Sequence, residues 1–161
     1  MSQRKTEILF KIYNEIQSQI RFCDTKTGFL LASTGILFGL LFDMYKHLST
    51  EGLTNNQQVV ITFSLICNIA ALIIYIISVF PRQGEDHDTI FYWDKICSYK
   101  NNEYYTKVSE QEEEGVQKDL SNQICVLADI CQTKMNHFKF GTFLLTLAII
   151  SAGIMYFLLY A

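Results

Sequence analysis

Proline is nearly absent from this sequence, since Pro81 is the only one among 161 residues. Neither proline nor glycine occurs before Gly28. A proline inside a helix removes a backbone hydrogen bond and clashes with the preceding turn. Its scarcity therefore permits long unbroken helices on both sides of Pro81.

The sequence also lacks the motifs of familiar enzyme active sites. It contains no phosphate-binding P-loop, no dinucleotide-binding glycine pattern and no HExxH zinc motif. His47 and His137 stand alone, and the run "GEDHD" at 84–88 is best interpreted as a solvated turn, because neighbouring loop residues do not easily converge on one ion. We therefore expect no catalytic residue, no bound metal, no cofactor and no enzymatic activity.

The cysteines show no paired spacing of the zinc-binding kind. We expect them to be reduced and to pack as small apolar side chains. They are Cys23, Cys67, Cys97, Cys125 and Cys131.

Three apolar blocks dominate what is present. They cover 28–42, 59–80 and 140–161, and neither of the last two contains a charged residue. A bilayer core is crossed by about 20 apolar residues in a helix. The first block is shorter, but Tyr45 and Lys46 can complete it at the far interface. The sequence thus predicts an all-α membrane protein with three transmembrane helices.

The distribution of cations predicts the orientation. Only Lys46 lies in the loop between the first two spans, whereas the other lysines and arginines precede the first span or lie between the second and third. Cations are retained on the cytoplasmic side. We expect a multi-pass protein of the cell inner membrane with its N-terminus in the cytoplasm. The expected segments are a cytoplasmic helix at 1–26, spans at 27–46, 59–80 and 139–161, an external loop at 47–58, and a cytoplasmic insert and long helix at 81–138.

Two amphipathic helices are predicted outside the membrane. Apolar residues recur every three or four positions from Ile8 to Cys23, and again from Val116 to Phe138. Ser109 and Glu112 have the spacing of a capping box, which predicts that the second helix begins at Glu110. We expect both helices to extend spans one and three into the cytoplasm as an antiparallel stalk.

Between these helices, four aromatics crowd into the polar segment 88–99. They are Phe91, Tyr92, Trp93 and Tyr99. One interpretation is that they close the stalk as a packed cap, and the other is that they offer flat surfaces on which a ligand stacks. The packed cap is favoured for any single ring.

Inside the spans, Asn68 is a costly polar group, and we expect it to bond to another span or a second copy rather than to line a pore. Gly35 and Gly39 have the small-xxx-small spacing that lets helices approach closely. Because three spans are too few to enclose a pore alone, we expect a homo-oligomer.

Several segments together resemble a known family. They are "FCDTKTGFLLASTGILF", "IFYWDKI" followed by "EYY", and "DLSNQICVLADICQTKMNHFKFG". In order and spacing these are similar to the transmembrane effectors of Pycsar antiphage systems. The most specific positions are Asp24, Lys26 and Gly28 at the first span, and Ile124, Leu127, Ile130 and Lys134 on the long helix.

The resemblance implies a function. In such systems a pyrimidine cyclase senses phage infection and makes a cyclic mononucleotide, and the membrane effector then impairs the inner membrane, which causes abortive infection. The implied partners are the lipid bilayer, the messenger and further copies of the chain, with no nucleic acid polymer. The alternative is a non-enzymatic adaptor whose stalk docks a protein partner, and an exposed apolar face on the stalk would distinguish it.

A cyclic mononucleotide requires a cation for its phosphate, a flat partner for its base and polar groups for its edges. Arg21 and Lys26 could serve as phosphate donors with Asp24 accepting from a hydroxyl, or the three could simply anchor the helix at the interface. The full set of candidate ligand residues is Arg21, Asp24, Lys26, Arg82, Phe91, Tyr92, Trp93, Asn122, Gln123, Asp129 and Lys134.

Overall fold

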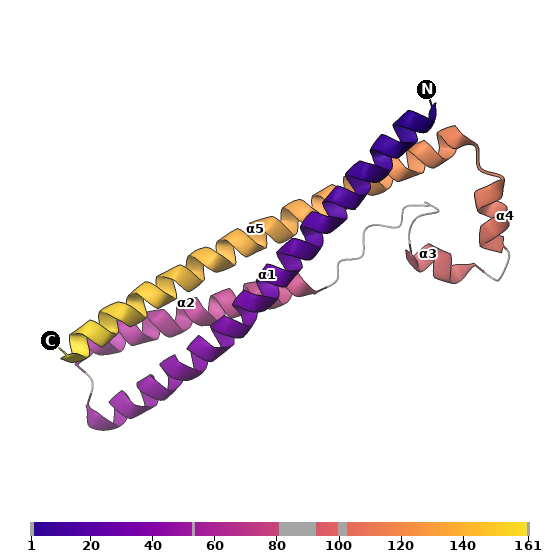
Figure 1. The fold of residues 1–161 in the computed structure, drawn as a ribbon. Coiled ribbons are helices and arrows are strands. Elements are labelled where there is room, and N and C mark those ends of the chain that lie inside the picture. The colour runs from indigo at the N-terminus through magenta and orange to yellow at the C-terminus, as the bar shows by residue number, and fades with distance from the viewer. Residues whose placement is uncertain (1, 53, 81–92, 100–102, 161) are drawn as a thin grey trace. The chain divides into compact units, whose positions relative to one another are not determined.

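The computed structural model describes residues 2–52, 54–80, 93–99 and 103–160. That part of the chain is all-helical and contains no strand, as predicted (Figure 1). Its helices are α1 (Ser2–Glu51), α2 (Asn55–Val79), α3 (Trp93–Ser98), α4 (Glu103–Ser109) and α5 (Glu113–Tyr160).

The chain forms two compact units. The polar unit comprises residues 1–22 and 81–133, and the span unit comprises residues 23–80 and 134–161. Helices α1 and α5 each contribute to both units without a break in the helix.

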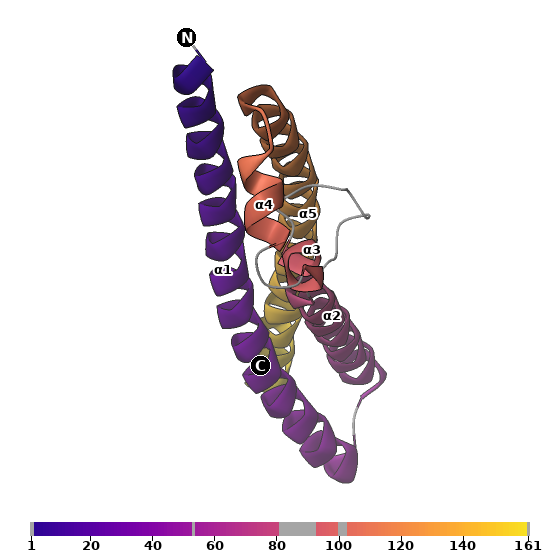
Figure 2. The same ribbon diagram turned by 90° about the vertical axis from the view of Figure 1, so that its right-hand side faces the viewer.

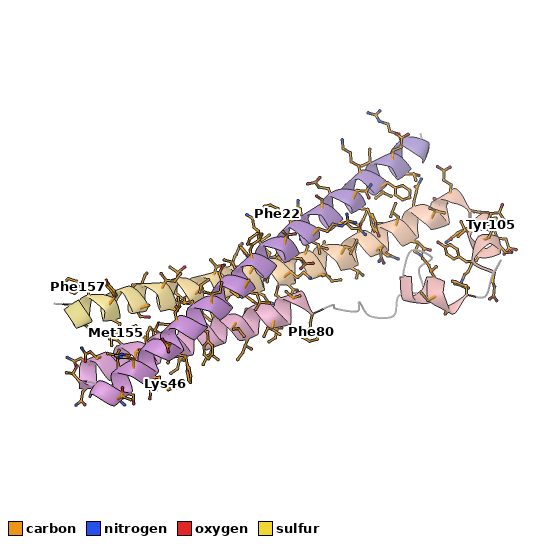
Figure 3. The ribbon with its side chains drawn as sticks, turned by 60° about the horizontal axis from the view of Figure 1, so that its bottom comes forward. Phe22, Lys46, Phe80, Tyr105, Met155 and Phe157 are labelled. Atoms are coloured by element: carbon orange, nitrogen blue, oxygen red, sulfur yellow. The ribbon has the colours of Figure 1, made fainter. Side chains whose placement is uncertain are left out.

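Helices α1, α2 and α5 are each long and apolar enough to cross a membrane. The prediction of three candidate spans is confirmed, and the chain has the character of a multi-pass membrane protein. The arrangement of side chains in the span unit supports the same conclusion. Large apolar residues point outward, among them Phe157 at 70% exposure, while the neighbouring Met155 is fully buried (Figure 3).

The buried residues of the span unit form a seam with a seven-residue repeat. On α2 and α5 most of them follow spacings of three and four, and on α1 they recur mainly every seven positions, which is the pattern of helices in a left-handed supercoil. Many of these residues are small or polar, as is common where helices pack inside a membrane. We call this set the polar seam: Thr27, Thr34, Ser64, Asn68, Ala71, Ser78, Lys134, Gly141, Ala148 and Ser151.

Helices α2 and α5 lie side by side in the span unit and run in opposite directions (Figures 1 and 2). Ser64 Oγ donates to the carbonyl oxygen of Ala148 at 2.9 Å, and Tyr75 Oη donates to Thr142 Oγ1 at 3.2 Å. Around Tyr75, Ala71 and Leu145 complete a buried cluster on which leucines of α1 also pack.

A short connection joins α1 to α2. Gly52 has a φ of +91°, a left-handed conformation that favours glycine and ends the helix. The backbone N–H of Thr54 then donates to Gln57 Oε1 at 3.1 Å, which satisfies a free donor at the start of α2. Helix therefore continues to Glu51 and resumes at Asn55, inside the segment 47–58 expected to be a loop.

The prediction that the extensions of spans one and three are antiparallel is wrong. In the polar unit, Gln117 Nε2 donates to Thr6 Oγ1 at 3.0 Å, and the two helices start at the same end (Figure 1). In the span unit, α1 reverses into α2 and α2 lies antiparallel to α5, so α1 and α5 again run in the same direction. The reason is topological. Along the chain α2 lies between α1 and α5 and crosses the span unit in the opposite direction, so α5 crosses it in the same direction as α1.

The predicted start of the long helix is also wrong. Ser109 is the last residue of α4, and its hydroxyl donates to the carbonyl oxygen of Thr106 at 2.8 Å instead of capping a following helix. Helix α5 begins at Glu113. The spacing of a capping box was present, but Ser109 was already engaged in the preceding turn.

Glycine allows close helix approach at Gly141 and leaves open space at Gly35 and Gly39. A Cβ atom added at Gly141 would lie 2.6 Å from Tyr75 Cε1, whereas one added at Gly35 or Gly39 would meet no described atom within 4 Å. The glycine pair of α1 therefore touches no other described helix of this chain, and its contact with a second copy stays a prediction.

We expect Gly141→Ala to lower the free energy of unfolding by about 1–2 kcal/mol, because overpacking outweighs the gain in helix propensity. The matched control is Gly35→Ala, which adds the same methyl group in open space and should be neutral or stabilising by up to about 1 kcal/mol. Unfolding of the purified protein in mixed detergent micelles measures both. Equal stability of the two variants would contradict the close contact between Gly141 and Tyr75.

Candidate functional site

A buried ion pair lies at one end of the span unit. Lys134 on α5, only 6% exposed, donates to Asp24 on α1. The Asp24 side chain is 39% exposed, so one face of the pair reaches solvent. A buried ammonium group is costly without a partner. This pair thus fixes α1 against α5 at the end of the span unit away from Gly52.

Three polar atoms that have no hydrogen-bond partner in the described part of the chain lie near the same end of the span unit. They are Thr27 Oγ1, Ser78 Oγ and His137 Nδ1, one from each of the three long helices. Thr27 and His137 each lie three residues beyond a member of the ion pair. The contacts of Tyr75 with Thr142 and of Ser64 with Ala148 place Ser78 level with residues 134–139 of α5. We call Thr27, Ser78 and His137 the polar layer.

Two other hydroxyl groups of the polar seam, unlike those of Thr27 and Ser78, bond to a carbonyl oxygen of their own helix. Thr34 Oγ1 donates to the carbonyl oxygen of Leu30 at 2.6 Å, and Ser151 Oγ donates to that of Leu147 at 2.9 Å. These bonds satisfy the hydroxyl within its own helix. Thr27 and Ser78 make no such bond, although they are 0% and 2% exposed.

Asn68 is the most costly polar residue of the span unit. It lies close to the middle of α2 and is 0% exposed, and neither its Oδ1 nor its Nδ2 has a hydrogen-bond partner among the described residues. Burying an amide without a hydrogen bond costs roughly 2–7 kcal/mol, depending on the reference state. The predicted bond to another span is absent. A bond to a second copy docked on the outer surface is not available to a side chain with no exposed area.

The polar unit carries an open groove of about 660 Å³. Thr6, Glu7, Phe10, Lys11 and Asn14 of α1 and Glu113 of α5 line it. The groove thus combines an aromatic ring, a lysine ammonium, a carboxamide and two carboxylates on one face. Phe10 is 41% exposed and its ring is accessible to a flat ligand.

A smaller aromatic cluster forms between α3 and α4. The rings of Tyr99 and Tyr104 are 5.9 Å apart, and Lys107 Nζ donates to Tyr99 Oη at 2.8 Å. Tyr105 on the same helix is 75% exposed (Figure 3). Of the four aromatics noted in the sequence, Tyr99 therefore takes part in a local ring contact.

The structure joins one pair of the predicted ligand residues, Asp24 and Lys134. Lys26 belongs to the span unit and is exposed, whereas Arg21, Asn122, Gln123 and Asp129 belong to the polar unit. Within that unit Gln123 is buried, and the other three are exposed. Arg82, Phe91 and Tyr92, together with the side chain of Trp93 and the run 84–88, lie outside the described residues.

Neither the groove nor the polar layer was predicted from the sequence. Phe10, Lys11 and Asn14 form a site only where α5 supplies the opposite wall, and no short motif indicates this. The layer had a readable pattern, because Thr27 and Ser78 fall on the seven-residue repeats of their helices. Polar residues at such positions in apolar helices indicate a buried polar site.

The comparison with known families adds an independent observation. The sequence model of the Pycsar effector protein domain matches residues 8–161 of the chain. No curated protein and no solved structure matches it. The match begins within α1 and includes the rest of both units, with α2, α3, α4 and α5 entire.

We expect Asp24→Ala to lower the free energy of unfolding by about 2–3 kcal/mol, less than the 3–5 kcal/mol typical of a fully buried pair because Asp24 is half-exposed. Lys134→Met keeps most of the length of the side chain and removes the charge. In the Lys134→Met background, Asp24→Ala should therefore cost almost nothing. An equal loss of stability in both backgrounds, measured by unfolding in detergent, would show that the ion pair does not stabilise the protein.

Proposed function

This chain belongs to the Pycsar effector protein family, and on that basis we propose that it is a membrane effector switched on by a cyclic nucleotide. Membership of the family implies a role in antiphage defence. In our proposal the messenger is a cyclic pyrimidine mononucleotide, the response is loss of inner-membrane integrity, and the outcome is abortive infection. The observation that carries the proposal is the family match over residues 8–161.

The helical architecture supports a receptor that acts on the membrane. Three helices have the length and composition of spans, and two of them continue unbroken into the polar unit. We propose that the N-terminus and the polar unit are cytoplasmic, because all but one of the cations lie there or near the ends of the spans facing that side. A change of packing in the polar unit can then be transmitted by rigid helices to the spans.

We propose that the groove of the polar unit binds the messenger. Lys11 offers a cation for the phosphodiester, and Phe10 offers a face on which the base stacks. Asn14, Glu7 and Glu113 offer donors and acceptors for the base edge and the ribose hydroxyl. A carboxylate is a suitable acceptor for the exocyclic amino group of cytosine. The groove therefore contains all the partners that a cyclic mononucleotide requires.

The proposed activity needs no enzymatic chemistry. Binding of the messenger would shift the chain between two packings, and no bond of the messenger would be broken. Because a single three-helix unit is narrow, we propose that several copies act together.

A second candidate function is an adaptor that docks a protein partner. A specific observation favours it, because large apolar residues stay exposed on α1 within the polar unit. They are Ile8 at 51%, Ile12 at 42% and Phe22 at 59% exposure. Such a face suits a partner helix or a second copy of this chain.

Thermal unfolding of the detergent-purified protein in the presence of the 3′,5′-cyclic forms of CMP, UMP, AMP and GMP tests the proposal. A cyclic pyrimidine nucleotide at 100 times its dissociation constant should raise the free energy of unfolding by about 2.7 kcal/mol. Lys11→Ala and Phe10→Ala should abolish this stabilisation.

The matched control is Lys5→Ala, which removes the same charge from the same helix at an exposed position outside the groove. It should leave the stabilisation unchanged. Stabilisation that survives in Lys11→Ala would place the messenger elsewhere. No stabilisation of the wild-type protein by any of the four nucleotides would favour the adaptor.

A further inference from the structure

The polar seam contains polar atoms that no residue in the described ranges satisfies in the resting packing. Thr27, Ser78 and Asn68 are at least 98% buried, and their side-chain oxygens and nitrogen lack partners. In lipid no bulk water is available to compensate for them. Two arrangements can satisfy such atoms, namely water held inside the seam or a second packing in which the helices part.

These atoms lie between one end of the span unit and its middle. The polar layer lies at the end marked by the ion pair, where the partly exposed Asp24 gives access from solvent. Asn68 lies near mid-helix, within the stretch of α2 bracketed by Ser64 and Tyr75. Polar groups therefore lead from one end of the span unit to its middle.

Beyond Ser64 large apolar side chains join the seam, and the one hydroxyl among its named residues there, that of Ser151, is satisfied within its own helix. Hydrogen bonds from Ser64 to Ala148 and from Gln57 to Leu158 place Ile61 of α2 beside the stretch of α5 that contains Met155. Both side chains are 0% exposed. Apolar constrictions close ion paths because water does not remain in them. Ile61 and Met155 have the position and the chemistry of such a barrier, and we call them the apolar gate.

We propose that, when several copies of the effector act together, the polar seam lines the path along which water and ions cross the membrane, with Asn68 in the lining and the apolar gate closing the path at rest. This inference rests on the proposed function and adds the route by which the membrane is breached. It also accounts for the unpartnered amide at mid-helix, since water that enters the open path can satisfy that amide.

The closed state is held where α1 meets α5. Helices α2 and α5 are joined by hydrogen bonds of Gln57, Ser64 and Tyr75 along much of their length. Helix α1 is joined to α5 by the pair of Asp24 and Lys134 at the inner end. Separation of α1 from the α2–α5 pair would expose the polar layer first and Asn68 next.

The experiment uses the full chain reconstituted into vesicles of phosphatidylethanolamine and phosphatidylglycerol, with a potential-sensitive dye reporting potassium leak. Asn68→Leu replaces the amide with an apolar side chain that has the same branching and the same number of heavy atoms. We expect it to raise the unfolding temperature in detergent and to slow leak induced by cyclic CMP or cyclic UMP by roughly tenfold or more. A merely structural Asn68 would predict the opposite change in stability. Leak at the wild-type rate in Asn68→Leu would overturn the inference.

A second arm needs no messenger, so it stays informative if the proposed function is wrong. Ile61→Ser makes the apolar gate polar and should cause leak without any nucleotide. The matched control is Ile66→Ser, which makes the same substitution on α2 at a side chain 61% exposed on the outer surface, and it should not leak. Equal leak from the two variants would indicate general disruption of the bilayer and would reject the path.

The two arms separate the two hypotheses. If wild-type vesicles do not respond to any cyclic mononucleotide but Ile61→Ser leaks and Ile66→Ser does not, the messenger assignment fails and the path stands. If wild-type vesicles respond but Asn68→Leu responds equally, the messenger stands and the path fails.

Discussion

A bilayer offers no water to the polar groups of the helices that cross it, and this constraint accounts for most of the span unit. Backbone groups are satisfied within each helix. Polar side chains then have three outcomes. Some bond back to their own helix, as Thr34 and Ser151 do, and some bond across helices, as Ser64 and Tyr75 do. The remaining group, Thr27, Ser78 and Asn68, has no partner. The first two groups stabilise one packing, whereas the third group favours a packing in which water is present.

This division connects the fold to the function. Many large apolar side chains face outward, and most of the small and polar ones of the span unit face the seam, so the same helices can be stable in lipid and yet hold polar groups inside. Because α1 and α5 belong to both units, a ligand that changes their packing in the polar unit acts on the helices that form the seam. The ion pair of Asp24 and Lys134 joins these two helices at the end of the span unit. Asp24 and Lys134 therefore hold the contact that must change before the seam opens.

The spans could be predicted because 22 uncharged residues leave few alternatives, and the family could be identified from the same segments that the family model covers. The parallel direction of α1 and α5 could also have been predicted. Successive spans cross the membrane in opposite directions, so the first and third of three spans cross in the same direction. The predicted antiparallel stalk disagrees with this rule. Asn68 was identified as unusual. Its lack of a partner depends on which residues of α1 and α5 surround it, and such neighbours cannot be read from one helix.

Helix ends also depend on neighbouring residues that a short motif does not include. Ser109 and Glu112 have the spacing of a capping box, as do Thr54 and Gln57, and in the structure only the second pair makes a capping contact at the start of a helix. What decides between them is the preceding chain. Gly52 ends α1 and frees Thr54 to begin α2, whereas Ser109 still belongs to α4. The groove was missed for a related reason, because Phe10 and Lys11 gain an opposite wall only when α5 packs beside them.

The most direct test of the central claim is electrical recording from the purified wild-type protein in a planar lipid bilayer, with a cyclic pyrimidine mononucleotide added on one side and then removed. The account predicts discrete current steps that appear with the nucleotide and disappear after its removal, as expected for a gated path through protein. No current, or irregular current that persists after the nucleotide is removed, would contradict it.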